Sequence, residues 1–299
     1  MGISSVMTHD TSVHYMGSRR LRDARIALAA CLLFLSGCTG LFLHPETGHR
    51  WDPADAGIVY EDVWLEAADG VRVHAWLLPA TEEPALGQVL FLHGNAENIS
   101  THIASVYWLP GAGYDVLLLD YRGFGLSEGR ADVSGIHRDS EAALQWMLER
   151  GDRKGRPTVL LGQSLGGAVA LTLAGESPAT ERLAGVVAEG AFSSYRRIAR
   201  EKFGELWLTW PFQWPLSLTV SDRFSPEDRV AGIAPVPLLL IAGEADPIVP
   251  PHHAERLLRR AGPPKDLWVV SGVGHNQSFA LASVRRRLLE WMEEHIDGG

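Results

Sequence analysis

The amino-acid sequence predicts an α/β fold built on a mainly parallel β-sheet with helices on both faces. Short apolar runs of strand length alternate along the chain with longer segments of helical periodicity. Several of these runs are apolar at nearly every position, as is typical of strands buried on both faces of a parallel sheet. With 46% hydrophobic and 21% charged residues, the chain of 299 residues has an ordinary globular composition and can bury a sizeable core.

The predicted sheet has eight strands. The first two, residues 59–65 and 71–78, flank an Ala67-Ala68-Asp69-Gly70 turn, and this Asp-Gly pair between apolar runs predicts a β-hairpin. The hairpin would add an antiparallel edge to the sheet. Six further strands are predicted at residues 89–93, 115–119, 158–161, 183–188, 237–242 and 267–270. Helical patterns cover residues 99–109, 133–149, 165–175, 252–261 and 279–295.

One segment, residues 198–229, interrupts the alternation between the sixth and seventh strands. Open α/β sheets bind ligands at the carboxyl ends of their strands, so we expect a short cap insertion over that edge. The insertion contains Trp207, Trp210 and Trp214, although two prolines are expected to break any helix that carries them. These rings either line an acyl-binding pocket as substrate-binding residues or pack the insertion onto the core.

The pattern Gly162-Gln163-Ser164-Leu165-Gly166 lies between a predicted strand and a predicted helix, which is the context of a nucleophile elbow. A Cβ atom at either glycine would crowd the neighbouring strand and helix. The turn leaves the Ser164 hydroxyl beyond the strand end and directs the Leu165 N–H toward a developing oxyanion. Because a five-residue pattern also arises by chance, the rest of the chain decides its meaning.

A serine hydroxyl needs a general base to become a nucleophile, and the base needs an orienting acid. Asp246 lies in the loop after the seventh predicted strand, and His275 lies in the loop after the last. Both loops are at the same edge of the sheet as Ser164. We therefore predict a Ser164–His275–Asp246 catalytic triad, with Glu244 and Glu189 as alternative acids.

The second oxyanion donor is expected in the loop after the third strand, which reads His93-Gly94-Asn95-Ala96. We assign it to the backbone N–H of Asn95, with Ala96 as the alternative register, so that the oxyanion hole consists of Asn95 and Leu165. Gly94 would let the backbone approach the site, and His93 is expected to brace the loop. No metal-ligand or cofactor motif is present in the sequence, so we predict neither a metal nor a cofactor.

The N-terminus carries the pattern of a signal peptide. Arginines precede an apolar stretch at residues 26–35, and a helix of this length, about 15 Å, is too short to cross a bilayer core of about 30 Å. The stretch ends in Leu35-Ser36-Gly37-Cys38, which resembles a bacterial lipobox and predicts lipidation of Cys38. The alternative is an ordinary signal with an unrelated cysteine. Met16 is an alternative start of translation.

These features predict three parts: a signal peptide over residues 1–37, a tether over residues 38–55, and a domain over residues 56–299. A lipidated Cys38 would attach the protein to a membrane of the bacterial cell envelope. Thr39 at the next position, rather than Asp, favours the periplasmic side of the outer membrane by analogy with other lipoproteins. The net charge is −9 and no basic run lies outside the N-terminus, so nucleic-acid binding is not expected. We expect a monomer.

Five stretches together resemble the α/β-hydrolase superfamily over about residues 59–296. They are Leu92-His93-Gly94-Asn95, Asp120-Tyr121-Arg122-Gly123-Phe124-Gly125, Gly162-Gln163-Ser164-Leu165-Gly166-Gly167, Gly243-Glu244-Ala245-Asp246-Pro247-Ile248-Val249-Pro250 and Gly274-His275. The set is most similar to the branch that contains serine aminopeptidase-like hydrolases, membrane-associated lysophospholipid lipases and protein depalmitoylases. This resemblance implies an α/β-hydrolase fold and the triad named above.

The function that follows is a serine hydrolase that cleaves acyl or lipid esters, or thioesters, through an acyl-enzyme. A peptidase of the same fold is one alternative, and Glu97 and Glu128 are the acidic residues available to bind a free amino group. A non-catalytic binding lipoprotein of the envelope is the other alternative. The complete predicted triad argues against it.

Overall fold

The computed structural model describes Gly2 and residues 43–296. The chain divides into two units, residues 1–38 and residues 39–299. Apart from Gly2, the predicted signal peptide lies outside the described residues, as does Cys38. Over the part that is described, no helix combines the length and the apolar character that crossing a bilayer requires.

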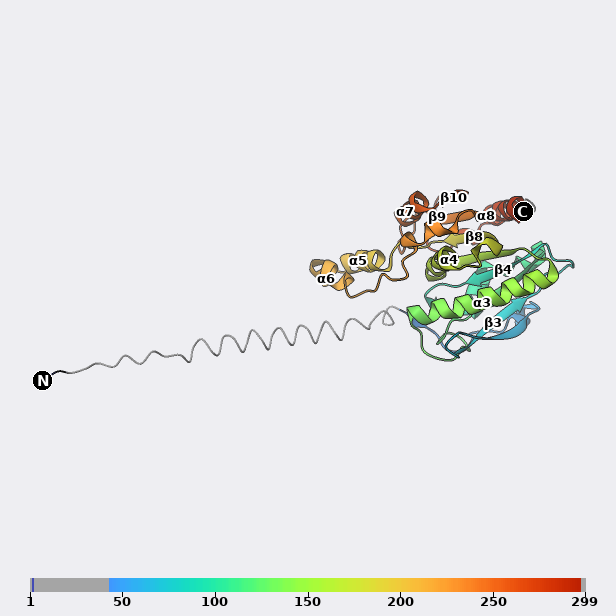
Figure 1. The fold of residues 1–299 in the computed structure, drawn as a ribbon, viewed down its shortest axis with the longest axis horizontal. Helices are drawn as coiled ribbons and strands as arrows, with labels where there is room; N and C mark the ends of the chain where they lie inside the picture. The colour runs from blue at the N-terminus through green and yellow to red at the C-terminus, as the bar shows by residue number, and fades with distance from the viewer. Residues whose placement is uncertain (1, 3–42, 297–299) are drawn as a thin grey trace. The chain divides into compact units, whose positions relative to one another are not determined.

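An eight-stranded sheet with the order β10-β9-β8-β7-β4-β6-β3-β2 forms the centre of the domain (Figure 1). All eight predicted strands are present. The hairpin strands β2 and β3 are antiparallel, β3 also pairs antiparallel with β6, and every other pairing in this sheet is parallel. The strands are β2 (Glu61–Glu66), β3 (Arg72–Leu78), β4 (Gly87–Leu92), β6 (Tyr114–Leu119), β7 (Thr158–Gln163), β8 (Leu183–Glu189), β9 (Leu238–Gly243) and β10 (Lys265–Val270).

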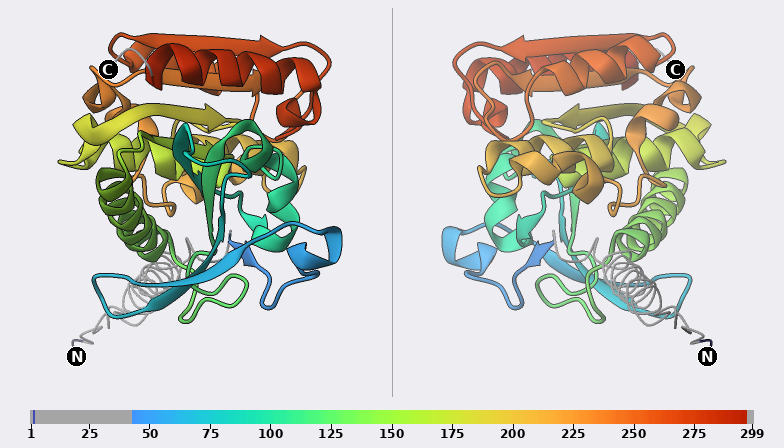
Figure 2. Two further views of the ribbon diagram at one scale, coloured as in Figure 1. Left: turned by 90° about the vertical axis from the view of Figure 1, so that its right-hand side faces the viewer. Right: turned by 90° about the vertical axis from the view of Figure 1, so that its left-hand side faces the viewer.

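Both faces of the sheet are buried, as the continuous apolar runs predict. In β4, Leu90 and Leu92 belong to one apolar core, whereas Val89 and Phe91 belong to the other. Helices cover both faces (Figure 2). The first core includes side chains of α3 (Val133–Lys154), α4 (Leu165–Glu176) and α7 (His252–Arg260), and the second includes side chains of α2 (Ile99–His102) and α8 (Ala282–Ile296).

Part of the segment expected to be a tether is folded against the domain. The strand β1 (His44–Pro45) pairs with the short strand β5 (Ala96–Glu97), and a 3₁₀ helix, η2, covers Pro53–Ala56. The Asn98 amide donates hydrogen bonds to the carbonyl oxygens of Glu46 and Gly48. These polar backbone contacts carry no apolar periodicity, so the sequence pattern does not reveal them.

The prediction of one helix over residues 99–109 is wrong. The structure has the single turn α2, followed by the 3₁₀ helices η3 (Ile103–Ser105) and η4 (Pro110–Ala112). The segment is rich in serine, threonine and β-branched residues, which favour a helix weakly, and Pro110 ends any continuation.

The predicted insertion between β8 and β9 is helical and irregular. It contains α5 (Tyr195–Glu205), η6 (Trp210–Phe212), α6 (Gln213–Ser217), η7 (Pro226–Asp228) and η8 (Val230–Ile233). α5 and α6 pack against each other (Figure 1). The three tryptophans therefore do not share one helix, in agreement with the proline pattern.

Candidate active site

Ser164 lies at the turn between β7 and α4 in a strained backbone conformation, with φ 55° and ψ −114°. The flanking glycines are required sterically. A Cβ atom at Gly162 would lie 2.2 Å from the Gly166 carbonyl oxygen, and one at Gly166 would lie 2.0 Å from the Leu92 carbonyl oxygen. The tight strand–helix turn that the sequence predicts is therefore present.

The structure brings Ser164, His275 and Asp246 together from three separate loops. His275 Nε2 lies 2.9 Å from Ser164 Oγ, and His275 Nδ1 lies 2.7 Å from Asp246 Oδ2. An ionised carboxylate only accepts hydrogen bonds, so Nδ1 carries a proton and Nε2 is left to accept from the serine hydroxyl. The three side chains thus form one continuous hydrogen-bonded chain.

The Asp246 carboxylate is held in place by its own loop. Its Oδ1 accepts hydrogen bonds from the backbone N–H groups of Ile248 and Val249, at 2.8 and 2.9 Å, which leaves Oδ2 facing His275. Burial of the carboxyl opposes ionisation, but the hydrogen bonds from His275 and the two N–H groups prevail and lower the pKa of Asp246. Asp246 is therefore held as a carboxylate.

Neither alternative acid is hydrogen-bonded to the imidazole in this way. Glu244 is exposed and accepts hydrogen bonds from Ser271 Oγ and the Gly272 N–H. Glu189 is fully buried, accepts from Gln163 Nε2 and from the Ser278 N–H, and burial raises its pKa.

Gly190 is a site residue that the sequence reasoning missed. Its φ is +59°, and a Cβ atom there would lie 3.2 Å from His275 Cε1 and 2.8 Å from Asn276 Oδ1. The absence of a side chain makes room for the imidazole. A glycine directly after the strand that neighbours the Ser164 strand is a signal that could have indicated it.

The loop expected to supply the second oxyanion donor lies against Ser164. A Cβ atom at Gly94 would be 3.6 Å from Ser164 Cβ, so Gly94, which precedes Asn95, lies close to the nucleophile. Leu165 is the first residue of α4, where a backbone N–H has no acceptor within the helix. Gly94 and Leu165 thus bring two backbone segments to Ser164, and the N–H groups of Asn95 and Leu165 remain the predicted oxyanion donors.

His93 braces this loop. Its side chain is fully buried, and its Nδ1 donates to the Gly94 carbonyl oxygen at 2.7 Å. The Tyr121 hydroxyl donates to the His93 carbonyl oxygen at 3.0 Å. Burial lowers the pKa of His93 to about 3, so the imidazole is neutral.

The loop over Asp120–Gly125, which contains Tyr121, is held in place by Arg122. The guanidinium of Arg122 forms hydrogen bonds with Asp139 of α3 and with Asp69 of the hairpin turn. Through Tyr121, this anchored loop supports the segment that lies against Ser164.

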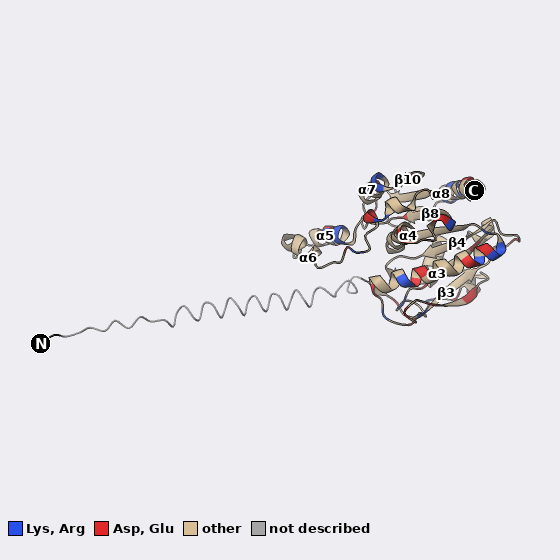
Figure 3. Ribbon diagram, viewed as in Figure 1, with Lys and Arg blue, Asp and Glu red and all other residues tan. Residues whose placement is uncertain are grey.

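The cap tryptophans are not packed onto the core. The exposed fractions of Trp207, Trp210 and Trp214 are 86%, 60% and 64%, which contradicts the alternative that they pin the insertion down. Residues 206–221 contain no charged residue, and α6 carries no Lys, Arg, Asp or Glu (Figure 3). The cap contacts the loop that contains Asp246, because Lys202 Nζ donates a hydrogen bond to the Pro247 carbonyl oxygen.

The two acidic residues considered for binding an amino group each lie beside an arginine. Glu97 forms an ion pair with Arg50 at 2.9 Å, and Glu128 lies 3.7 Å from Arg72. Their negative charges are therefore already partnered.

Two groups of side chains in the described part of the chain have the spacing of metal ligands: His49, His74 and Asp120, and Glu201, His252 and His253. Neither group includes a member of the predicted triad.

Comparison with known proteins gives the family. A family model described as serine aminopeptidase, S33, matches residues 83–227. The chain is 34% identical to YfhR of Escherichia coli K12, covering 74% of this chain and 75% of YfhR. It is 33% identical to the α/β-hydrolase domain-containing protein WAV2 of Arabidopsis thaliana, covering 70% of this chain and 69% of WAV2.

Among solved structures, the esterase Pf2001 of Pyrococcus furiosus superposes with a TM-score of 0.66 at 23% identity, covering 86% of this chain and 97% of that one. This likeness concerns the fold. Together with the relatives that are 33% and 34% identical over 219 and 224 aligned residues, it shows that the chain belongs to the α/β-hydrolase superfamily.

Proposed function

We propose that this protein is a serine hydrolase that cleaves acyl or lipid esters, or thioesters, through an acyl-enzyme. The observation that carries the proposal is the hydrogen-bonded chain from Ser164 through His275 to Asp246. A serine in a strained turn, a base at 2.9 Å and a buried carboxylate behind the base are the parts that acyl transfer requires.

In this proposal His275 Nε2 removes the Ser164 proton as Oγ attacks the carbonyl carbon of the substrate. The negative oxygen of the tetrahedral intermediate accepts hydrogen bonds from the N–H groups of Leu165 and Asn95. Asp246 stabilises the imidazolium, which then protonates the departing alcohol or thiol. Water, deprotonated by the same imidazole, releases the acid and restores the hydroxyl.

The apolar surface of the cap supports the proposal that the substrate carries an apolar acyl group. Large apolar side chains are exposed along it, although exposing them to water is unfavourable. An acyl chain offers such a surface a partner that a charged peptide does not. These side chains are Leu206, Trp207, Leu208, Trp210, Phe212, Trp214 and Leu218.

The test is an activity screen with acyl esters, thioesters and aminoacyl anilides, combined with a fluorophosphonate probe. We expect the probe to label Ser164, and Ser164→Ala to lower kcat by about 10⁴-fold or more while the fold persists. The matched control is Ser177→Ala at the far end of α4, which should keep full activity. Undiminished esterase activity in Ser164→Ala would remove this serine from the role.

The description of the matching family model favours a peptidase as the second candidate. Against it, the two acidic residues suited to an amino terminus, Glu97 and Glu128, are partnered with arginines. The same screen separates the candidates, because a peptidase would cleave aminoacyl anilides faster than acyl esters of matched leaving group.

We also propose that Cys38 carries a lipid anchor that holds the enzyme on the periplasmic side of the outer membrane. The support is the Leu35-Ser36-Gly37-Cys38 pattern after the apolar stretch. Cys38→Ser should move the protein from the membrane fraction to the soluble periplasmic fraction. A mature protein whose N-terminus lacks an acylated cysteine would contradict this.

A further inference from the structure

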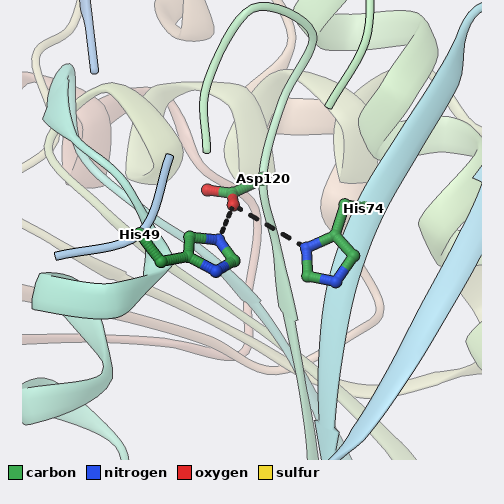
Figure 4. A group of neighbouring side chains, drawn as sticks. All are labelled: His49, His74 and Asp120. Atoms are coloured by element: carbon green, nitrogen blue, oxygen red, sulfur yellow. Dashed lines mark hydrogen bonds and ion pairs between the residues drawn. The ribbon is translucent and has the colours of Figure 1, made fainter. Parts of the chain in front are cut away.

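A group of two histidines and one aspartate, of which His74 and Asp120 are buried, lies apart from the triad. His49 comes from the N-terminal segment, His74 from β3, and Asp120 directly follows β6 (Figure 4). His49 Nε2 lies 2.8 Å from Asp120 Oδ2, and His74 Nδ1 lies 4.0 Å from the same oxygen. The three donor atoms lie within 4.8 Å of one another.

The hydrogen bonding of His74 leaves one nitrogen available as a ligand. Its Nε2 lies 2.7 Å from Asp62 Oδ1, so Nε2 carries the proton and Nδ1 presents its lone pair. Nδ1 is buried without a hydrogen-bond partner and faces the Asp120 carboxylate, too far away for a hydrogen bond. A carboxylate behind a histidine is the usual outer support of a metal-bound imidazole.

Asp120 is surrounded by imidazole rings, and His49 Nε2 is hydrogen-bonded to its Oδ2 at 2.8 Å. Its side chain is fully buried, and its Oδ1 accepts from the Ile99 backbone N–H. His93 Nε2, 3.7 Å from Oδ1, offers only a lone pair, because the other nitrogen of that ring donates to Gly94. A cation bound at Oδ2 would add to the stabilisation that the His49 N–H gives this buried carboxylate.

Gly125 keeps the space beside this carboxylate free of a side chain. A Cβ atom at Gly125 would lie 1.8 Å from Asp120 Oδ2 and 2.9 Å from His49 Nε2. The His49 side chain is slightly exposed, at 13%, which gives an ion a path to the group from solvent. Among the described residues, no side chain covers the shared oxygen from the Gly125 side, and the exposed edge of His49 gives an entry route.

The second group of this kind provides an internal contrast. His253 Nδ1 accepts a hydrogen bond from the Ser193 backbone N–H, and its Nε2 lies 3.0 Å from Glu201 Oε2. Both nitrogens of this buried ring are therefore occupied within the protein. His252, the remaining member, is largely exposed.

We propose that His49 Nε2, His74 Nδ1 and Asp120 Oδ2 bind a zinc ion that fastens the N-terminal segment to the central sheet. Two imidazole nitrogens and one carboxylate oxygen suit Zn²⁺ better than the oxygen-preferring Mg²⁺ or Ca²⁺. Zinc distances of about 2.0–2.2 Å require His49 Nε2 and Asp120 Oδ2, now 2.8 Å apart, to separate, and His74 Nδ1 to move closer to Oδ2 from 4.0 Å. His49 becomes a ligand when its proton moves from Nε2 to Nδ1.

The experiment uses the purified full chain, stripped with a chelator and titrated with Zn²⁺. We expect one zinc per chain by calorimetry and elemental analysis, and a melting temperature that rises with zinc concentration. His49→Ala should abolish both effects. His49→Gln, whose amide still donates to Asp120, should abolish them as well and guards against a folding defect. His252→Ala is the matched control, and it should bind zinc as the parent does.

Two results would overturn the proposal. If the stripped parent takes up no zinc and its melting temperature is the same with and without the ion, hydrogen bonds alone stabilise the Asp120 carboxylate. If both His49 variants retain the zinc, or if His252→Ala loses it, the ion lies elsewhere. None of these readouts depends on hydrolytic activity, so they test the site independently of the proposed function.

Discussion

At the scale of single residues, the position of a side chain relative to a strand end carries most of the predictive power. Ser164, Asp246 and His275 each follow a predicted strand, and parallel strands bring their carboxyl ends to one edge. Gly190 also directly follows a strand, but that position alone does not assign its role. Its role depends on where the His275 ring lies in three dimensions, which one sequence does not reveal.

Asp246→Asn tests the orienting role of this carboxylate. An amide that presents N–H₂ to His275 Nδ1 favours the wrong tautomer, so we expect kcat to fall by about 10³–10⁴-fold, less than for His275→Ala. Steady-state kinetics with an acyl ester measures this. Glu244→Gln, which changes the exposed carboxylate two residues away, should stay within about twofold of the parent. A silent Asp246→Asn would return the role to Glu244 or Glu189.

At the scale of elements, apolar periodicity located every strand of the main sheet but failed where polar contacts decide the structure. The segment after residue 98 breaks into short turns because its helix propensity is low. Residues 43–50 join the domain through hydrogen bonds to Asn98, Glu97 and Asp120. Contacts of this kind leave no periodic trace in a sequence.

The cap is the element on which substrate preference should depend. If its exposed rings contact an acyl chain, kcat/KM should rise with chain length beyond acetate, by up to about fourfold per CH₂ group. Trp210→Ala should flatten that rise more than it lowers acetate hydrolysis. Trp64→Ala removes a partly exposed ring from β2 instead and serves as the control. A parent without chain-length preference, or a variant changed only in melting temperature, would make the cap structural.

At the scale of the whole molecule, the fold seals several ionisable groups between its layers, and these make stability depend on pH. His137 of α3 stacks on Phe224, with ring centroids 4.3 Å apart, and so joins a core helix to the segment before β9. Its Nε2 is buried without a partner, and burial lowers its pKa to about 4. The sequence shows the histidine but not its burial, because that depends on the packing of two distant segments.

The folded state therefore binds a proton at His137 less readily than the unfolded chain, whose pKa is about 6.5. The contribution of the neutral ring is complete above about pH 6.5 and is lost as pH falls toward 4. As pH falls through that window, we expect protonation of this residue in the unfolded chain to lower the free energy of unfolding by about 1.4 kcal/mol per pH unit. Urea titrations at pH 7, 6 and 5 measure the free energy of unfolding of the parent and of His137→Gln. The other buried histidines are present in both proteins, so their contribution cancels in the difference between the two. The same change at the exposed His252 should leave the pH dependence unaltered, and parallel curves for the parent and His137→Gln would show that His137 does not set it.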